Sequence, residues 1–333
     1  MSRWLWKTIA RQKSEFSGQQ WLWKSVAGGK MTDDRDYIGY GNPQLKVTWP
    51  NNARIAVQFV VNYEEGGENC ILNGDLHSEA FLSEIVSAQP LPGVRHMNME
   101  SIYEYGSRAG FWRLYRIFTE YGITPTVYGV ALAMQKNKPV IEAMLGAKWE
   151  IASHGYKWID YQFIAEEVEA EHISRAIEIH KSLTGKPPAG WYTGRNSPNT
   201  RRLVLDQLPN LKYDSDSYAD DLPYFIHHRE RRHLVIPYTL DTNDMRFASV
   251  QGFNSGEQFY QYLKDAFDVL YKEGIEYPKM LNIGLHCRLI GRPARAASLI
   301  RFIEYIQSQR QVWIPTREQI ADHFWQNYAI NSN

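Results

Sequence analysis

Acidic and histidine side chains stand directly after short apolar stretches of this chain. Glu64 and Glu65 follow the apolar run at residues 53–61, and His154 and His286 follow two later runs. A crowded carboxyl group has a raised pKa and can act as a general base, and a histidine titrates near neutral pH. The alternatives are a solvated turn for the glutamates and histidines bonded to neighbouring backbone.

Arg195 and Asp214 also come at the ends of apolar segments. An arginine suits a bidentate contact to a carboxylate or a carbonyl oxygen, with a structural ion pair as the alternative. Asp214 opens a segment with four aspartates, which could bind a cation but more often forms turns. The sequence has no serine or cysteine in a nucleophile-elbow pattern. Cys287 is next to His286, but neighbours along a strand point to opposite faces, so we do not expect the two to form a catalytic pair. Water is the predicted nucleophile.

Alternating strands and helices must position these side chains. An alternation over roughly 270 residues predicts an α/β protein with a mostly parallel sheet in one (β/α) barrel-like domain, whose chemistry lies at the C-terminal strand ends. The predicted strands are 53–61, 124–130, 149–153, 189–193, 211–214, 233–237, 280–285 and 312–314, and the predicted helices are 101–121, 164–183, 255–273, 293–309 and 316–328.

Composition excludes several classes of protein. The 333 residues are 44% apolar, which argues against wholesale disorder, and 37 basic residues balance 37 acidic ones, which argues against a nucleic-acid binder. Two cysteines are too few for a disulfide framework and fit the cytoplasm. Apolar runs fall short of the ~20 residues of a membrane span.

The first 30 residues differ from the rest of the chain. They carry six basic residues and one acidic residue, and the quartet Trp-Leu-Trp-Lys occurs in them twice. Such a segment could be an interfacial membrane helix. We expect residues 1–30 to be a basic extension upstream of a natural start near Met31, and residues 31–333 to form a single catalytic domain.

Five motifs in order resemble those of the polysaccharide-deacetylase family. They are Asn62-Tyr63-Glu64-Glu65-Gly66, Ser153-His154-Gly155, Arg195-Asn196-Ser197-Pro198, Tyr213-Asp214-Ser215-Asp216 and Leu285-His286. The resemblance implies a distorted (β/α) barrel of the NodB type that cleaves an amide with water on a divalent metal held by one Asp and two His. This chain departs from the pattern, with Glu64-Glu65 in place of an Asp pair and Trp158 where the second metal-binding His is expected.

Three longer segments, residues 100–113, 191–200 and 283–292, resemble the allantoinase branch of that family. The similarity covers roughly residues 33–328. It implies opening of the ring of (S)-allantoin to allantoate in urate catabolism, without metal, by a homotetramer. A small cyclic amide would be the substrate.

The resemblance and the residue chemistry together predict site roles. We expect Glu65 to be the general base, with Glu64 as the alternative, and His286 to be the general acid. Arg195 would bind a carboxylate or polarise the carbonyl, His154 would donate to the oxyanion, and Asp214 would orient Arg195 or His286. The predicted substrate-binding residues are Trp158, Trp191 and Tyr192 as an aromatic wall, together with Asn62, Glu100, Tyr103 and Arg108, of which the last three could come from a lid, a neighbouring subunit or simply a packed helix.

Other functions stay open at this point. A metal-dependent N-deacetylase of peptidoglycan or chitin-type sugars is one, a hydantoinase or other cyclic-imide hydrolase is another, and an inactive scaffold is a third. No cofactor is expected, although a residual divalent metal such as zinc could bind through Glu65, His154 and His286. Neither nucleic acid nor a membrane span is expected among the partners.

Overall fold

The computed structural model describes residues 35–41 and 44–329. The chain divides into two units, residues 1–41 and residues 42–333. In the first unit, Asp36 accepts hydrogen bonds from the backbone N–H groups of Ile38 and Gly39, at 2.8 and 3.0 Å. The predicted basic extension, residues 1–30, lies outside the described residues.

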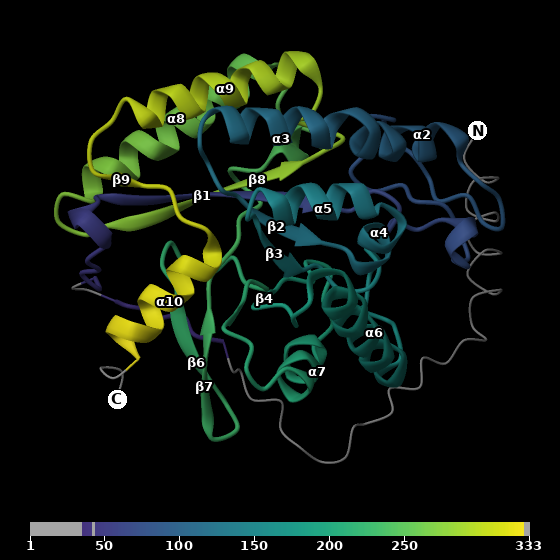
Figure 1. Cartoon of the computed structure of the whole chain (residues 1–333), viewed down its shortest axis with the longest axis horizontal. Coiled ribbons are helices and arrows are strands. Elements are labelled where there is room, and N and C mark those ends of the chain that lie inside the picture. The colour runs from purple at the N-terminus through teal and green to yellow at the C-terminus, as the bar shows by residue number, and fades with distance from the viewer. Residues whose placement is uncertain (1–34, 42–43, 330–333) are drawn as a thin grey trace, which may run out of the picture. The chain divides into compact units, whose positions relative to one another are not determined.

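The second unit is built on one mixed sheet (Figure 1). Its strand order is β6-β7-β5-β4-β3-β2-β1-β8, and β9 pairs with the first residues of β1. All pairs are parallel except β6–β7. The strands are β1 (Ile55–Tyr63), β2 (Thr126–Gly129), β3 (Glu150–Ser153), β4 (Gly190–Trp191), β5 (Tyr213–Asp214), β6 (Tyr224–His228), β7 (Arg231–Val235), β8 (Lys279–His286) and β9 (Val312–Trp313).

The barrel does not close. Within the described residues, β8 meets the far side of the sheet only through an isolated bridge between Asn243 and Gly284 and a few single hydrogen bonds. The fold is therefore a half-barrel, which confirms the predicted distorted α/β barrel.

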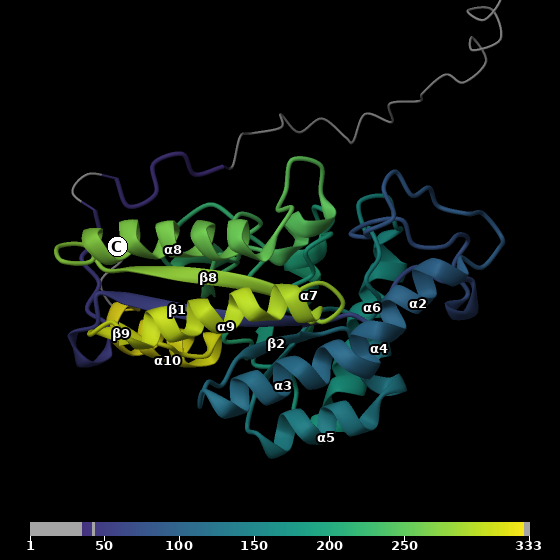
Figure 2. The same cartoon turned by 90° about the horizontal axis from the view of Figure 1, so that it is seen from above.

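Helices cover the outside of the sheet. Helices α3, α9 and α8 lie side by side over β1 and β8 (Figure 2). None of the helices in the described part is long and apolar enough to cross a membrane. The helices are α2 (Met97–Tyr105), α3 (Phe111–Glu120), α4 (Ala131–Lys136), α5 (Lys138–Gly146), α6 (Glu166–Thr184), α7 (Thr200–Gln207), α8 (Gly256–Glu273), α9 (Pro293–Gln307) and α10 (Arg317–Tyr328).

One predicted helix is divided. The expected helix at 101–121 is α2 and α3 joined by a π-helical turn, Gly106–Gly110. Both glycines of that turn pack so closely that a side chain at Gly106 would meet Glu65, and one at Gly110 would meet the carbonyl of Cys287. Tertiary packing thus places the turn where sequence periodicity gives no signal. Helices α4, α5 and α7 and the antiparallel strand β6 were also not predicted.

The two faces of β1 have different roles. Phe59 points outward and packs against Phe118 of α3 and Phe302 of α9, with ring centroids 5.5 and 6.5 Å apart. Gln58, the residue before Phe59, points into the barrel and accepts a hydrogen bond from the buried Arg317 at 2.9 Å. Because side chains alternate along a strand, β1 builds the outer core and lines the barrel interior at once.

Candidate active site

A cavity of about 550 Å³ opens at the C-terminal ends of the strands. Asn62 and Glu64 reach it from the end of β1, His154 from the end of β3, Tyr192 from β4 and His286 from β8. These groups were expected at strand ends, and the structure brings them together. The whole lining comprises Asn62, Glu64, Phe81, Leu82, His154, Trp158, Asp160, Gln162, Tyr192, Gly194, Arg195, Asn196, Tyr218, Tyr238, Leu240, Asn243, Met245 and His286.

Glu64 lies at the centre of the polar groups. Its Oε1 is 3.4 Å from Nε2 of His154 and 3.5 Å from Nε2 of His286. Its Oε2 accepts a hydrogen bond from Arg288 Nη1 at 2.7 Å. Burial opposes ionisation, but the positive charges of Arg288 and His286 outweigh it and hold the pKa of Glu64 well below its ordinary value. Glu64 is therefore a buried carboxylate anion.

His286 is oriented by an aspartate that sequence analysis did not select. Its Nδ1 is 2.6 Å from Oδ1 of Asp244, whose Oδ2 accepts the backbone N–H groups of His286 and Ile290. Burial disfavours the imidazolium, but Glu64 and Asp244 overcome that effect and raise the pKa of His286 to about 9. At neutral pH His286 is a cation that can donate a proton.

His154 is fixed through the neighbouring strand. Its Nδ1 is 3.0 Å from the carbonyl oxygen of Tyr192, so the Nδ1–H donates to that carbonyl. The opposite ring nitrogen then faces Glu64 and the cavity. Such a backbone contact sets which nitrogen is presented to a substrate.

Glu65 lies behind Glu64, outside the described lining of the cavity. Its Oε2 accepts the backbone N–H of Glu64 at 3.1 Å, and its Oε1 is 3.8 Å from Arg288. Burial and the nearby Glu64 charge, against the opposing effect of Arg288, raise the pKa of Glu65 to about 7. Glu64, which was expected only as the alternative base, therefore faces the cavity, and Glu65 does not.

Aromatic rings and an arginine form one wall. The rings of Phe81 and Trp158 stack with centroids 5.8 Å apart, and Arg195 Cζ lies 5.4 and 5.1 Å from these two centroids. Glu79 holds the guanidinium at 3.7 Å. A flat polar ligand can stack on this wall and accept hydrogen bonds from Arg195.

Two expected site residues have other roles. Asp214 does not orient Arg195 or His286, because it binds Arg201 at 2.9 Å and His233 at 2.8 Å. Trp191 points away from the cavity into an apolar cluster under α6 and α7, since it is the last residue of β4 and the next residue, Tyr192, takes the opposite side.

The residues expected from α2 and its continuation also lie outside the described cavity lining. Glu100 pairs with Arg95, and Arg108 is exposed on the π-helical turn. Tyr103 is buried with its ring 4.3 Å from Cζ of Arg288. Within this chain, these three residues do not contact the space that a substrate would take.

The side chains do not fit the metal that the resemblance implies for the wider family. In the described part of the chain, no three His, Cys, Asp or Glu side chains are grouped so that they could hold a metal ion. Trp158 stands where a second ligand is expected, and the cation Arg288 contacts both Glu64 and Glu65. As the chain stands, one expected ligand is replaced and a positive charge already lies against Glu64, so these side chains do not fit a metal ion.

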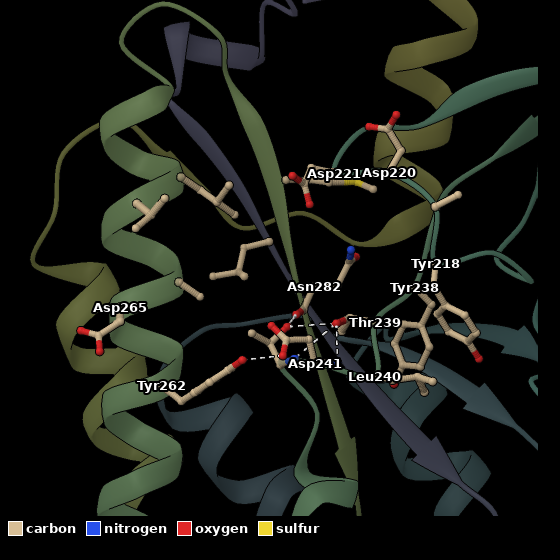
Figure 3. Close-up of a pocket in the computed structure, with 17 residues that line it drawn as sticks. Tyr218, Asp220, Asp221, Tyr238, Thr239, Leu240, Asp241, Tyr262, Asp265 and Asn282 are labelled. Atoms are coloured by element: carbon tan, nitrogen blue, oxygen red, sulfur yellow. Dashed lines mark hydrogen bonds between the residues drawn. The ribbon is translucent and has the colours of Figure 1, made fainter. Parts of the chain in front are cut away.

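A second cavity of about 970 Å³ adjoins the first (Figure 3). The two share a wall of Tyr218, Tyr238 and Leu240. On the opposite side stands α8, from which Tyr262 donates a hydrogen bond to Asp241 at 2.5 Å. The second cavity lies along β8, where the half-barrel is open.

Comparison with known proteins agrees with this geometry. The polysaccharide deacetylase profile matches residues 98–211. A polysaccharide-deacetylase relative from Schizosaccharomyces pombe is 44% identical over 310 residues, which cover 87% of this chain and 97% of the relative. This chain belongs to the polysaccharide deacetylase family.

Two solved structures are similar to this deacetylase-family protein over nearly their whole length. A family protein from Pseudomonas aeruginosa PAO1 is 61% identical with a TM-score of 0.88, covering 90% of this chain and 100% of that one. The PuuE allantoinase is 59% identical, also with a TM-score of 0.88, covering 89% of this chain and 99% of that one. The NodB-type half-barrel is thus shared with solved members of the family.

Proposed function

We propose that this protein is a hydrolase of carbon–nitrogen bonds in cyclic amides and that it opens the ring of (S)-allantoin to give allantoate. The observation that carries the proposal is the joining of Glu64, His154 and His286 in one cavity of a chain 59% identical to an allantoinase. The reaction adds water to a ring amide carbon, breaks the bond from that carbon to nitrogen, and leaves a carboxylate.

Glu64 is positioned to take the proton from water, and its place in the cavity, not its lowered pKa, favours it as the base. It is an anion in the cavity, whereas Glu65 lies behind it. A positioned general base contributes about 10²–10⁴-fold to such a reaction. We therefore assign the base to Glu64 in place of Glu65.

The two histidines complete the proton and charge balance. His286, protonated at neutral pH and oriented by Asp244, donates a proton to the ring nitrogen as it leaves. His154 faces the same space and, when both of its ring nitrogens carry a proton, donates its Nε2–H to the oxyanion that forms on the attacked carbonyl. Arg195 and the stacked rings beside it hold the flat ring and its ureido group.

Three further properties belong to this proposal. The reaction uses no metal cofactor. Two features support this: Trp158 stands in place of an expected metal ligand, and the cation Arg288 lies beside Glu64. The active form is a homotetramer acting in purine catabolism, which the resemblance to the allantoinase branch supports. It acts in the cytoplasm, which the low number of cysteines supports. Mass photometry of the purified chain tests the tetramer, and imaging of a fluorescent fusion tests the location.

The test compares substrates before and after chelation. Purified protein is given (S)-allantoin, hydantoin and an acetylated chitooligosaccharide, with metal content assayed on the same sample. We expect turnover of allantoin that survives chelation. Preference for the oligosaccharide or hydantoin would overturn the substrate, and loss of allantoin turnover on chelation with recovery on zinc would overturn the metal-free reaction.

A further inference from the structure

A buried arginine lies directly behind the catalytic groups. Arg288 is in the turn after β8 and has no solvent exposure. Its Nη1 is 2.7 Å from Glu64 and 3.8 Å from Glu65, so a single cation contacts both carboxyl groups. Taking a charge out of water costs several kcal/mol, which an ion pair offsets only in part, so a fully buried arginine between two glutamates requires an explanation.

The surroundings of Arg288 hold the guanidinium in place but do not supply acceptors for all of its N–H groups. Its Cζ lies 4.3 Å from the ring centroid of Tyr103 and 5.4 Å from that of Trp158. Its Nε and Nη2 find no hydrogen-bond partner among the described residues, and the same is true of Glu65 Oε1 and the Tyr103 hydroxyl. A purely structural arginine would have its donors paired, since unmet buried donors cost free energy.

The location of the charge is informative. Glu64 and Glu65 stand at the motif positions where the family resemblance implies an acidic pair that works with a divalent cation, and Trp158 replaces a ligand of that cation. Arg288 brings a fixed positive charge to the same two side chains. An arginine stays charged at all working pH values and repels a second cation at this distance.

We propose that Arg288 is the built-in cation of this site: it positions Glu64 for catalysis, and its charge prevents divalent metal ions from binding there. Arg288 is thus a positioning residue, because it acts through Glu64. The catalytic half of the inference rests on the proposed hydrolysis, whereas the metal half does not.

The test uses Arg288→Ala and Arg288→Lys in the full chain. We expect Arg288→Ala to lower kcat/KM for allantoin by about 100-fold, mainly through kcat, because an electrostatic partner of the reacting groups is lost. Added guanidinium chloride should restore part of the rate, while sodium chloride at equal ionic strength should not. Arg292→Ala is the matched control, since Arg292 is the partly exposed N-cap residue of α9 and stacks on Tyr105.

Metal binding is measured separately, by titration with Co²⁺ and visible absorption. We expect no site in the wild-type protein, a new site in Arg288→Ala, and its loss in Arg288→Ala combined with Glu64→Gln. Arg288→Lys, which keeps the charge, should fold even if Arg288→Ala does not, bind no Co²⁺ and lose about 10-fold in kcat.

Three results would overturn the proposal. They are full kcat/KM in Arg288→Ala, a Co²⁺ site in the wild-type protein that requires Glu64, and the absence of any Co²⁺ site in folded Arg288→Ala. If the wild-type protein does not open allantoin, the proposed function fails, and the Co²⁺ titrations still decide whether Arg288 excludes metal.

Discussion

Arg288 and Arg317 are both fully buried in the half-barrel, but their surroundings differ in kind. Arg317 donates to neutral acceptors, among them the side chain of Gln58 at 2.9 Å, the hydroxyl of Ser215 at 3.2 Å and the carbonyl of Pro237 at 2.8 Å. Arg288 contacts two acidic side chains and leaves two nitrogens without a partner in the described structure.

The difference separates a structural charge from a functional one. The acceptors of Arg317 come from β1, from the segments after β5 and β7, and from β8, so it ties together the strands of a barrel that does not close. Saturating a buried guanidinium with neutral acceptors lowers its desolvation cost. The unsaturated charge of Arg288 lies instead at the C-terminal strand ends, beside the proposed reaction site.

The largest effect on the catalytic side should come from Glu64→Gln. The amide cannot accept a proton, so we expect kcat to fall by about 10³-fold. Steady-state kinetics with allantoin measure it. The matched variant Glu65→Gln should lose no more than about 10-fold, since Glu65 lies behind the cavity lining. A larger loss in Glu65→Gln than in Glu64→Gln would return the base to Glu65.

The structural side is tested by Arg317→Met. Removing this arginine leaves the acceptors of four strand regions unpaired, and we expect a loss of about 3–5 kcal/mol in the free energy of unfolding. Urea titration measures this loss. The kcat/KM of the remaining folded protein should stay within about 10-fold of wild type. A stable Arg317→Met protein with greatly reduced activity would remove the distinction between the two arginines.

Asp244→Asn should change the pH dependence. Protonated His286 is the proposed acid, so activity should fall as pH rises through its pKa of about 9. Asp244 helps to raise that pKa, and without its charge the alkaline decline should move to lower pH, with a loss of about 10–100-fold in kcat. The kcat/KM profile between neutral and alkaline pH measures both. A decline that stays in place would contradict the role of Asp244.

A smaller effect is expected from Gly106→Ala. The backbone φ of −57° suits alanine, but the added Cβ would meet the carboxyl group of Glu65. We expect a loss of about 1–3 kcal/mol in the free energy of unfolding from overpacking. Gly146→Ala is the control, because a Cβ there meets no described atom within 4 Å. Equal unfolding free energies for the two variants would show that the π-helical turn tolerates a side chain.

The sequence was sufficient for the parallel strands and for the groups at their ends. Period and turn residues predicted β1, β3, β8 and α8 to within two residues, and they placed His154 and His286 at the ends of parallel strands. The helix expected at 316–328 is confirmed as α10, whose first turn is held by a capping box between Thr316 and Gln319.

The partners of those groups could not be predicted in the same way. Asp244 is 42 residues from His286, and the packing of the short 3-10 helix Asp244–Ala248 against β8 brings them together. Glu64 and Glu65 follow β1 in succession. Which of them faces the cavity depends on the turn after that strand, and the periodicity of the sequence does not determine it. Nothing in the local sequence distinguishes the surroundings of Arg288 from those of Arg317.

The wall between the two cavities has a consequence for how this enzyme could change. Tyr218, Tyr238 and Leu240 alone are common to both, and Leu240 and Tyr218 are about half exposed. Smaller side chains at these positions would join the first cavity, whose size suits a small ring, to the second cavity along β8. Substrate length is then governed by very few positions, so an evolving lineage could pass between compact and extended substrates while its proton-transfer groups stay untouched.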